Sequence, residues 1–132
     1  MKWIILLINI LFLTSCSSGN TLPKQAIPTL IKVEQTFPKK EIRLIKDPEQ
    51  IAQIIGFVNQ YTDNWTVPWY GPPVGQIYFN FYSDNEYVGN FYVGPHFFGR
   101  DYGDFWSQNA NKSDISKLGK LSEIDLLTLI AP

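Results

Sequence analysis

The chain has 132 residues, with 11 Lys or Arg against 12 Asp or Glu, which gives a formal net charge of −1. Without a surplus of basic residues it lacks the electrostatic footprint of a nucleic-acid-binding protein, so no nucleic-acid partner is expected. Aromatic residues make up 15% of the chain, which excludes a disordered tail and predicts a folded unit. The length is that of one domain with a small hydrophobic core.

The beginning of the chain is organised like an export signal. Lys2 supplies a positive charge, and residues 3–13 form an apolar run that only Asn9 interrupts. This run has the length of a signal-peptide core. It is shorter than the about 20 residues that a bilayer-spanning helix needs. We therefore expect residues 1–15 to be a signal peptide.

The segment Leu13-Thr14-Ser15-Cys16 resembles a lipobox, the recognition site of bacterial lipoprotein processing. The resemblance implies cleavage before Cys16, a diacylglycerol thioether on its sulfur and a fatty acid such as palmitate on its amine. Cys16 is the only cysteine, so an intramolecular disulfide is excluded. Several acyl chains on one residue hold a protein firmly at a membrane. In this family, an Asp directly after the cysteine often retains the protein at the inner membrane. This chain has Ser17 at that position, which favours a location at the outer membrane, facing the periplasm.

Residues 16–40 have the composition of a linker between this anchor and the domain. Small polar residues follow Cys16, and Pro23, Pro28 and Pro38 recur at intervals. A short strand around Ile31 is the one element expected inside the linker.

The domain is predicted to span residues 41–132 and to begin with a strand at residues 41–46. Asp47 suits the N-cap of a following helix, and Pro48 fits its first position. Gln50 completes a capping box, three residues after the cap. The apolar residues of this helix recur at helical spacing: Ile51, Ile54, Ile55, Val58 and Tyr61.

A loop rich in Pro and Trp at residues 62–74 separates the helix from an alternating hairpin, whose strands are predicted at residues 76–83 and 86–93. A three-residue hairpin loop would set Phe79 opposite Phe91, whereas a two-residue loop would set Phe79 opposite Asn90. Because a one-residue slip moves every side chain to the other face, the apolar pairing favours the longer loop. It would also set Ile77 opposite Val93.

A short strand at residues 96–98, a turn at residues 99–103 and a return strand at residues 104–107 complete the predicted sheet. Residues 108–120 are polar and are expected to form a surface loop. Ser122 is expected to cap a last helix, with Leu121 and Leu126 placed as a hydrophobic staple.

The strand-helix-strands-helix order predicts an α+β fold, with a small antiparallel sheet and helices packed on one face. The pattern is similar to that of small uncharacterised bacterial envelope proteins, whose last hairpin carries a turn like Gly103-Asp104-Phe105. That resemblance implies no activity.

The catalytic candidates are few. His96 is the only histidine, and Asp101 or Asp104 would have to orient it as a general base. A serine triad would need Ser107 or another serine as its nucleophile, but no Gly-x-Ser-x-Gly elbow is present. One histidine and one lipidated cysteine cannot build an ordinary zinc site. No metal and no cofactor are therefore expected.

Aromatic residues provide the candidate binding surface. Tyr78, Tyr82 and Tyr92 would share the sheet face opposite Phe79, with the aromatic residues of the preceding loop nearby. If this face is open, it forms a platform for a protein, peptide or glycan. If the loop folds across it, the same residues are additional core. The loop residues of this platform are Trp65, Trp69 and Tyr70.

Two functional hypotheses follow from the sequence. The first is a non-enzymatic, lipid-anchored envelope protein that acts as a small binding or interaction module. The second is a lipid-anchored periplasmic hydrolase that uses His96 with Asp101 or Asp104. The first is favoured because no combination of nucleophile, base and orienting acid is visible.

Overall fold

The computed structural model describes residues 19–71 and 74–130. The signal peptide predicted at residues 1–15 and the lipidation site predicted at Cys16 lie outside the described residues. Among the residues that are described, no helix combines the length and the apolar character needed to cross a bilayer.

The described residues form an α+β fold, with one antiparallel sheet and three helices. The sheet has six strands in the order β2-β1-β3-β4-β5-β6. Helix α1 (Pro48–Val58) lies between β2 and β3 in the chain, whereas α2 (Lys112–Ser122) and the short α3 (Leu126–Leu129) follow β6. The predicted strand-helix-strands-helix order therefore matches only in part. The strands are β1 (Leu30–Thr36), β2 (Lys39–Ile45), β3 (Ile77–Ser83), β4 (Glu86–Gly94), β5 (Phe97–Asp101) and β6 (Phe105–Asn109).

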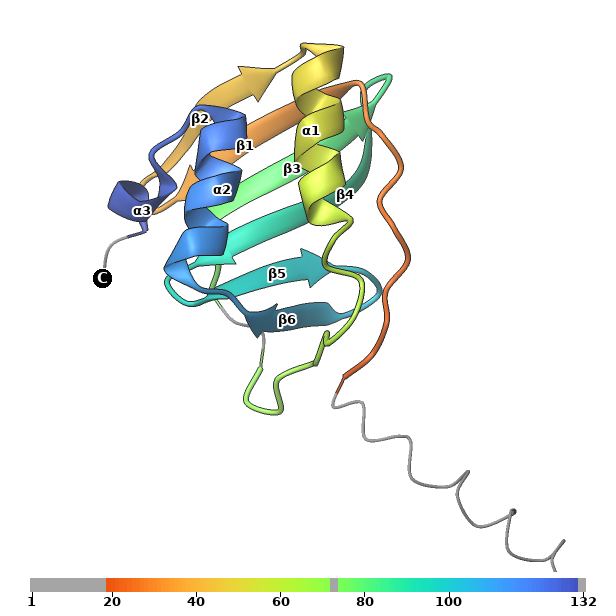
Figure 1. Ribbon diagram of the computed structural model, residues 1–132, viewed down its shortest axis with the longest axis vertical. Coiled ribbons are helices and arrows are strands. Elements are labelled where there is room, and N and C mark those ends of the chain that lie inside the picture. Colours follow the sequence, from red (N-terminus) through yellow and green to blue (C-terminus); the bar gives the residue numbers. More distant parts are fainter. Residues whose placement is uncertain (1–18, 72–73, 131–132) are drawn as a thin grey trace, which may run out of the picture.

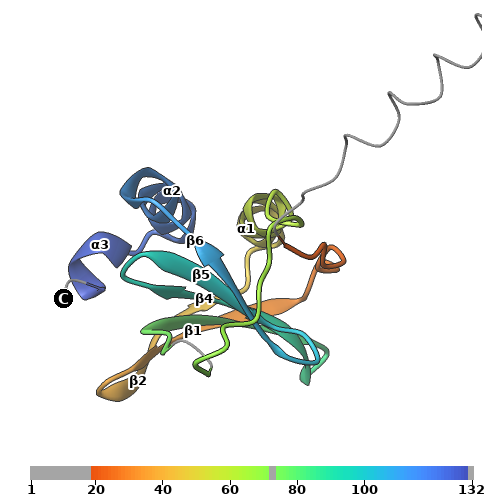
Figure 2. The same cartoon turned by 90° about the horizontal axis from the view of Figure 1, so that it is seen from below.

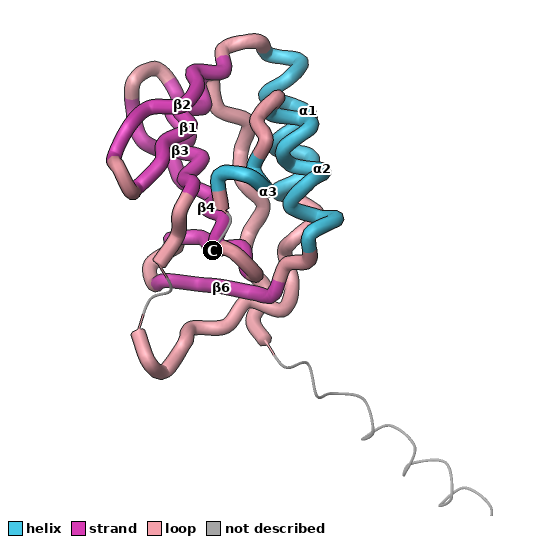
Figure 3. Tube along the Cα trace, turned by 90° about the vertical axis from the view of Figure 1, so that its left-hand side faces the viewer, coloured by secondary structure: helices cyan, strands magenta, loops and turns pink. Residues whose placement is uncertain are grey.

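Helices α1 and α2 cover one face of the sheet, here called the inner face (Figure 1). Figures 2 and 3 show the same two layers from other sides, with the strands in one layer and both helices in the other. No helix of residues 19–71 or 74–130 covers the opposite, outer face (Figure 2). The inner-face side chains are fully buried and form the centre of the core: Ile31, Val33, Ile77, Phe79, Phe81, Phe91, Val93 and Phe98.

The sheet begins well before residue 41, inside the stretch for which the sequence predicts a linker. β1 lies between β2 and β3, so Ile31 and Val33 are buried. The segment before β1 also packs on the domain. Leu22 is buried in the core, and its N–H donates to the Thr62 carbonyl oxygen at 2.8 Å. The backbone N–H of Gln25 donates to Asn59 Oδ1 at 2.7 Å.

Helix α1 begins as its sequence predicts but ends at Val58, so Tyr61, which the helical spacing places on this helix, lies beyond its end. Asp47 is the N-cap and accepts a hydrogen bond from the Gln50 N–H at 3.1 Å, and Pro48 is the first helical residue. Gln50, the expected partner in a capping box, instead donates from Nε2 to the Leu121 carbonyl oxygen at 3.0 Å. This side chain therefore joins α1 to α2. The buried face of α1 consists of Ile51, Ile54, Ile55, Phe57 and Val58.

The surface loop predicted at residues 108–120 is wrong, because most of α2 lies there. Asn111 is its N-cap and accepts from the Asp114 N–H at 2.8 Å. Ser122 does not cap a following helix but ends α2, where its buried hydroxyl donates to the Leu118 carbonyl oxygen at 2.8 Å. Asp125 is the N-cap of α3. The apolar pattern of α2 is sparse because Gly119 and Ser122 occupy two of its buried positions.

The β3–β4 hairpin has the predicted pairs but a different turn. Phe79 pairs with Phe91 and Ile77 with Val93, as predicted. The predicted three-residue loop is wrong, since Ser83 pairs with Glu86 across Asp84 and Asn85, whose φ angles are 50° and 69°. Positive φ at both central residues is typical of the two-residue hairpin turn. A bulge at Val88 then shifts the register and restores the apolar pairing.

The β5–β6 hairpin is longer than predicted. β5 continues to Asp101, through part of the predicted turn, and the chain reverses at residues 102–104. Gly103 has a φ of 69°, a conformation that favours glycine. The longer strand places Arg100 on the inner face, two residues beyond the buried Phe98.

Candidate functional site

The six aromatic residues expected to form one platform lie in three different environments. Tyr78, Tyr82 and Tyr92 share the outer face of the sheet, Trp65 lies in the core, and Trp69 and Tyr70 project from the loop after α1. Each environment determines what the rings can contact.

Tyr92 has the environment of a core residue, although it lies on the outer face. Only 1% of the residue is exposed. Its ring stacks on that of Tyr78, with 4.7 Å between centroids and 26° between planes. The ring also covers Gly99 of the neighbouring strand so closely that a Cβ there would overlap it. These contacts leave Tyr92 almost no surface for a ligand.

Asp101 lies near Tyr92 and is held by Asn90. The Asn90 Nδ2 donates to Asp101 Oδ2 at 3.0 Å, and the Asp101 N–H donates to Asn90 Oδ1 at 2.9 Å. The Tyr92 hydroxyl is buried and has no hydrogen-bond partner among the described residues. Burial, followed by the negative charge of Asp101, raises the pKa of Tyr92 above its ordinary value.

Tyr82 remains half-buried on the same face. Its ring meets that of Tyr87 edge-on at 5.8 Å, and the Lys32 Nζ lies 5.5 Å from its centroid. Burial, followed by the charge of Asp101, raises the pKa of Tyr87 to about 12. The outer face therefore carries interacting tyrosines that are only partly open to solvent.

Trp65 packs in the core and has no exposed surface. Its Nε1 donates to the Tyr61 carbonyl oxygen at 2.8 Å, and its ring meets Phe91 edge-on at 6.3 Å. Its backbone pairs with Asn20 through hydrogen bonds of 2.8 and 3.1 Å. Trp65 thus anchors both the loop and the N-terminal segment.

Trp69 and Tyr70 are the open aromatic residues of the loop, with 94% and 71% exposure. Their rings meet edge-on at 5.7 Å, with 83° between the planes. The loop extends beyond β6 at the lower end of the molecule (Figure 1). It is attached to this edge strand by two hydrogen bonds between the backbones of Thr66 and Ser107, at 3.0 and 2.8 Å. The Gln108 side chain adds a bond to the Asp63 carbonyl oxygen at 3.0 Å.

A cleft of about 800 Å³ lies between this loop and the end of the β5–β6 hairpin. We call it the aromatic cleft. It brings together three segments that are distant in sequence. Its lining residues are Asn64, Thr66, Val67, Pro68, Trp69, Tyr70, His96, Phe97, Ser107, Gln108 and Asn109.

The aromatic cleft combines apolar rings with neutral polar groups. None of the described residues that line it is Asp, Glu, Lys or Arg. Hydroxyl and amide groups supply both donors and acceptors. Ligand sites typically combine such apolar walls with a few polar groups that fix orientation. Three amide side chains of the cleft, Asn64, Gln108 and Asn109, are not among the site residues predicted from the sequence. The alternation along β6 was a signal for the last of them, since Asn109 shares the face of Ser107.

His96 is exposed at the β4–β5 turn and lines the aromatic cleft, but its expected acidic partners lie elsewhere. Asp101 is at the other end of β5, which at about 3.3 Å per residue places it roughly 16 Å away along the strand. Asp104 lies in the turn at that same far end. The structure therefore brings His96 and Ser107 into one cleft, and the described residues that line it include no carboxylate to orient a catalytic histidine.

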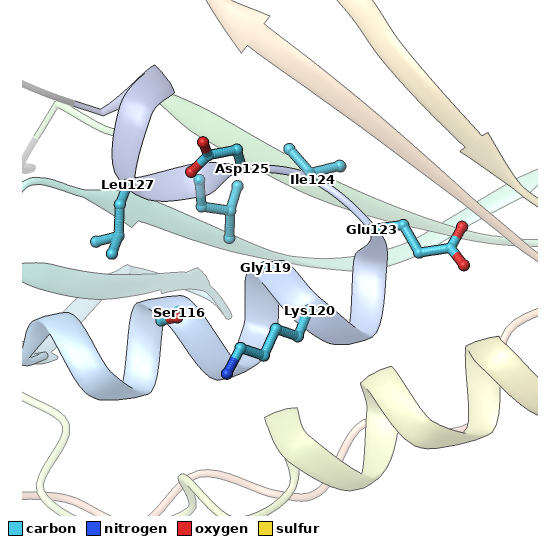
Figure 4. A pocket seen from close by; sticks show the side chains of 8 residues that line it. Ser116, Gly119, Lys120, Glu123, Ile124, Asp125 and Leu127 are labelled. Atoms are coloured by element: carbon cyan, nitrogen blue, oxygen red, sulfur yellow. The ribbon is translucent and has the colours of Figure 1, made fainter.

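A smaller hollow of about 340 Å³ lies at the α2–α3 turn (Figure 4). Its charged side chains, Lys120, Glu123 and Asp125, point in different directions and do not converge on one point (Figure 4). Within residues 19–71 and 74–130, no group of three or more His, Cys, Asp or Glu residues is arranged to hold a metal ion.

Comparisons with protein-family models, with curated proteins and with solved structures found no match to this chain.

Proposed function

We propose that this protein is a lipid-anchored component of the bacterial cell envelope and acts as a non-enzymatic binding module. The anchor rests on the lipobox-like segment Leu13-Thr14-Ser15-Cys16 and on the apolar run before it. The observation that carries the binding function is the aromatic cleft, in which the exposed Trp69 and Tyr70 stand beside neutral polar groups.

The composition of the cleft favours an uncharged, polar ligand, and a glycan fits best. The apolar face of a sugar ring packs on an aromatic ring, while its hydroxyls need neutral donors and acceptors beside it. Trp69 offers the ring, and Asn109 and Ser107 offer amide and hydroxyl groups. A charged ligand would find no opposite charge among the described lining residues.

The hydrolase alternative has weaker support. Ser107 and His96 line the same cleft, but Asp101 is bonded to Asn90 on the outer face and Asp104 lies in the distant turn. A serine hydrolase needs an acid that holds the histidine in the correct orientation. Turnover of an ester or amide probe that is lost in His96→Ala would favour the hydrolase.

The anchor is tested by metabolic labelling with a fatty acid and by membrane fractionation. We expect the wild-type chain to carry the label and to sediment with membranes. Cys16→Ala should remain unlabelled and accumulate as the precursor. Equal labelling of the two proteins would contradict the proposed anchor.

The ligand class is tested by calorimetric titration of the full chain in detergent with chitohexaose, maltohexaose and an uncharged hexapeptide. We expect saturable binding of at least one oligosaccharide and its loss in Trp69→Ala. Phe37→Ala is the matched control, because Phe37 is an exposed aromatic residue in the β1–β2 turn. Binding of the peptide alone would replace the glycan by a peptide ligand.

A further inference from the structure

The sheet opens between β4 and β5 beyond the pair Tyr92–Gly99. The ladder of these strands contains three pairs, and Tyr92–Gly99 is the last at this end. Beyond this pair, the Asn90 side chain forms hydrogen bonds with Asp101 in place of a backbone pair between the strands. The Gln25 side chain of the N-terminal segment approaches from the other side and donates to the Val88 carbonyl oxygen at 3.4 Å. The opening is therefore bordered by polar side chains.

Arg100 lies in this opening and is 4% exposed. Its Nη1 donates to the Pro23 carbonyl oxygen at 2.6 Å, and its Cζ lies 5.6 Å from the ring centroid of Tyr102. A guanidinium has five N–H donors. Among the described residues, Pro23 supplies the one acceptor recorded for Arg100, and no carboxylate lies within 4.0 Å. A buried charge is normally paired with an opposite charge. Within the described residues, Arg100 has no such partner.

A cleft of about 420 Å³ adjoins Arg100. We call it the β4–β5 cleft. Its other charged lining residues are Lys24 and Asp101, so the three side chains together carry one net positive charge. The Asp101 carboxylate accepts from Asn90 and does not pair with Arg100. Gly89, Tyr102 and Gly103 are among its other lining residues.

We propose that the β4–β5 cleft is a binding site for a small oxyanion, a phosphate or a carboxylate, held by Arg100 and Lys24. The planar guanidinium presents parallel N–H groups that match two oxygens of such a group. Lys24, exposed at the rim, adds a second positive charge. The proposal is independent of the aromatic cleft, which shares none of these residues.

The competing explanation is that Arg100 only fixes the N-terminal segment through Pro23, with water satisfying its other donors. The two explanations differ in what they predict for Lys24. If Arg100 only fixes the N-terminal segment, removing the charge of Lys24 has no effect on anion binding. If the cleft is an oxyanion site, removing this charge lowers the affinity for the anion.

The test is calorimetric titration of the full chain in detergent with inorganic phosphate and, separately, with succinate, at constant ionic strength in sodium chloride. We expect saturable binding of at least one anion at a single site. Arg100→Lys keeps the charge but loses the parallel N–H groups, so binding should weaken about tenfold. Lys24→Gln should weaken it about threefold. Lys39→Gln removes the same charge from an exposed lysine of β2 and should bind like wild type.

The anion that binds identifies the ligand class, and binding of both assigns a general oxyanion site. Should Arg100→Lys fail to fold, Lys24→Gln and the amide resonances of Gly89, Tyr102 and Gly103 in the wild-type titration decide instead. Absence of saturable binding of either anion at millimolar concentration would overturn the proposal. Equal binding by Lys24→Gln and wild type would do the same, as would resonance shifts confined to other parts of the chain.

Discussion

The inner face of the sheet and the aromatic cleft are both rich in aromatic residues, but they differ in how those residues are used. On the inner face Phe79, Phe91 and Phe98 are fully buried beneath the helices. In the aromatic cleft Trp69 and Tyr70 project into solvent and contact mainly each other. A small domain without a disulfide needs apolar burial for stability. Aromatic rings left outside its core are therefore the ones available for binding.

One loop contains both kinds of residue. Trp65 is buried, and its indole N–H is satisfied by Tyr61, whereas Trp69 has neither property in the described part of the chain. Because the buried and the exposed aromatic residues have different contacts, we expect their substitution to change different properties of the protein. Changes on the inner face should alter the free energy of unfolding, and changes in the aromatic cleft should alter binding.

The largest effect is expected for Phe79→Ala. Phe79 is fully buried and pairs with Phe91 at the centre of the inner face. Truncation of a buried Phe costs about 3–5 kcal/mol of stability. Urea denaturation of the variant measures this cost. A loss within about 0.5 kcal/mol, the range of ordinary surface substitutions, would contradict the assignment of this face to the core.

A pH-dependent loss of stability is expected from Tyr61, which adjoins the core beneath α1. Burial, followed by the negative charge of Asp114, raises its pKa from 10.0 to about 12. Above pH 10 the unfolded chain releases this proton while the folded chain keeps it. Stability therefore falls as the pH rises from 10 to about 12 and is fully present below that window.

Tyr61→Phe tests this expectation, because it removes the titrating hydroxyl and keeps the ring. Urea midpoints measured across the window should fall less steeply with pH in the variant than in wild type. Tyr87 also has a pKa of about 12, so part of the slope remains. Identical slopes for the two proteins would contradict the role given to Tyr61.

A smaller effect is expected for Tyr82→Ala, on the outer face of the same strand as Phe79. Tyr82 is half-buried, and its recorded ring contacts are with Tyr87 and Lys32. Loss of a cross-strand pair costs about 0.2–1 kcal/mol. Thermal melts of Tyr82→Ala and Phe79→Ala, measured together, compare the two faces. Equal losses would mean that the outer face contributes to the core as much as the inner face.

Sequence patterns were sufficient where local chemistry and packing agree. Asp47 and Pro48 define the start of α1, and its apolar residues recur at the helical period, so the helix could be predicted. The pair Phe79–Phe91 followed from the need to keep one face apolar. The turn type did not follow, because the bulge at Val88 lets a two-residue turn give the same pairing.

Patterns failed where tertiary contacts replace apolar spacing. The buried face of α2 includes Gly119 and Ser122, so its sequence resembles a polar loop. The segment before β1 has linker composition, yet it is held by Arg100 and Asn59 from distant parts of the chain. Neither contact leaves a local signal in the sequence.

The aromatic cleft could be predicted only in part. Trp69 and Tyr70 belong to an aromatic loop that the sequence identifies. The sequence does not show which of Trp65 and Trp69 is buried. In the structure, Trp65 is buried because its indole N–H donates to the Tyr61 carbonyl oxygen and its ring packs on Phe91. His96 lines the cleft because it lies beside the end of β6, next to the aromatic loop. The Ala110 N–H holds it there by donating to the His96 carbonyl oxygen at 2.9 Å.

The most direct test of the central claim is to measure stability and oligosaccharide binding on the same preparation of Trp69→Ala. Because Trp69 is almost fully exposed, we predict a free energy of unfolding within about 0.5 kcal/mol of wild type. Oligosaccharide binding should weaken at least about tenfold, as expected for loss of a central aromatic contact. Trp69→Phe should recover part of the affinity. Wild-type affinity in Trp69→Ala, or a loss of stability like that of Phe79→Ala, would contradict the assignment of this ring to ligand binding.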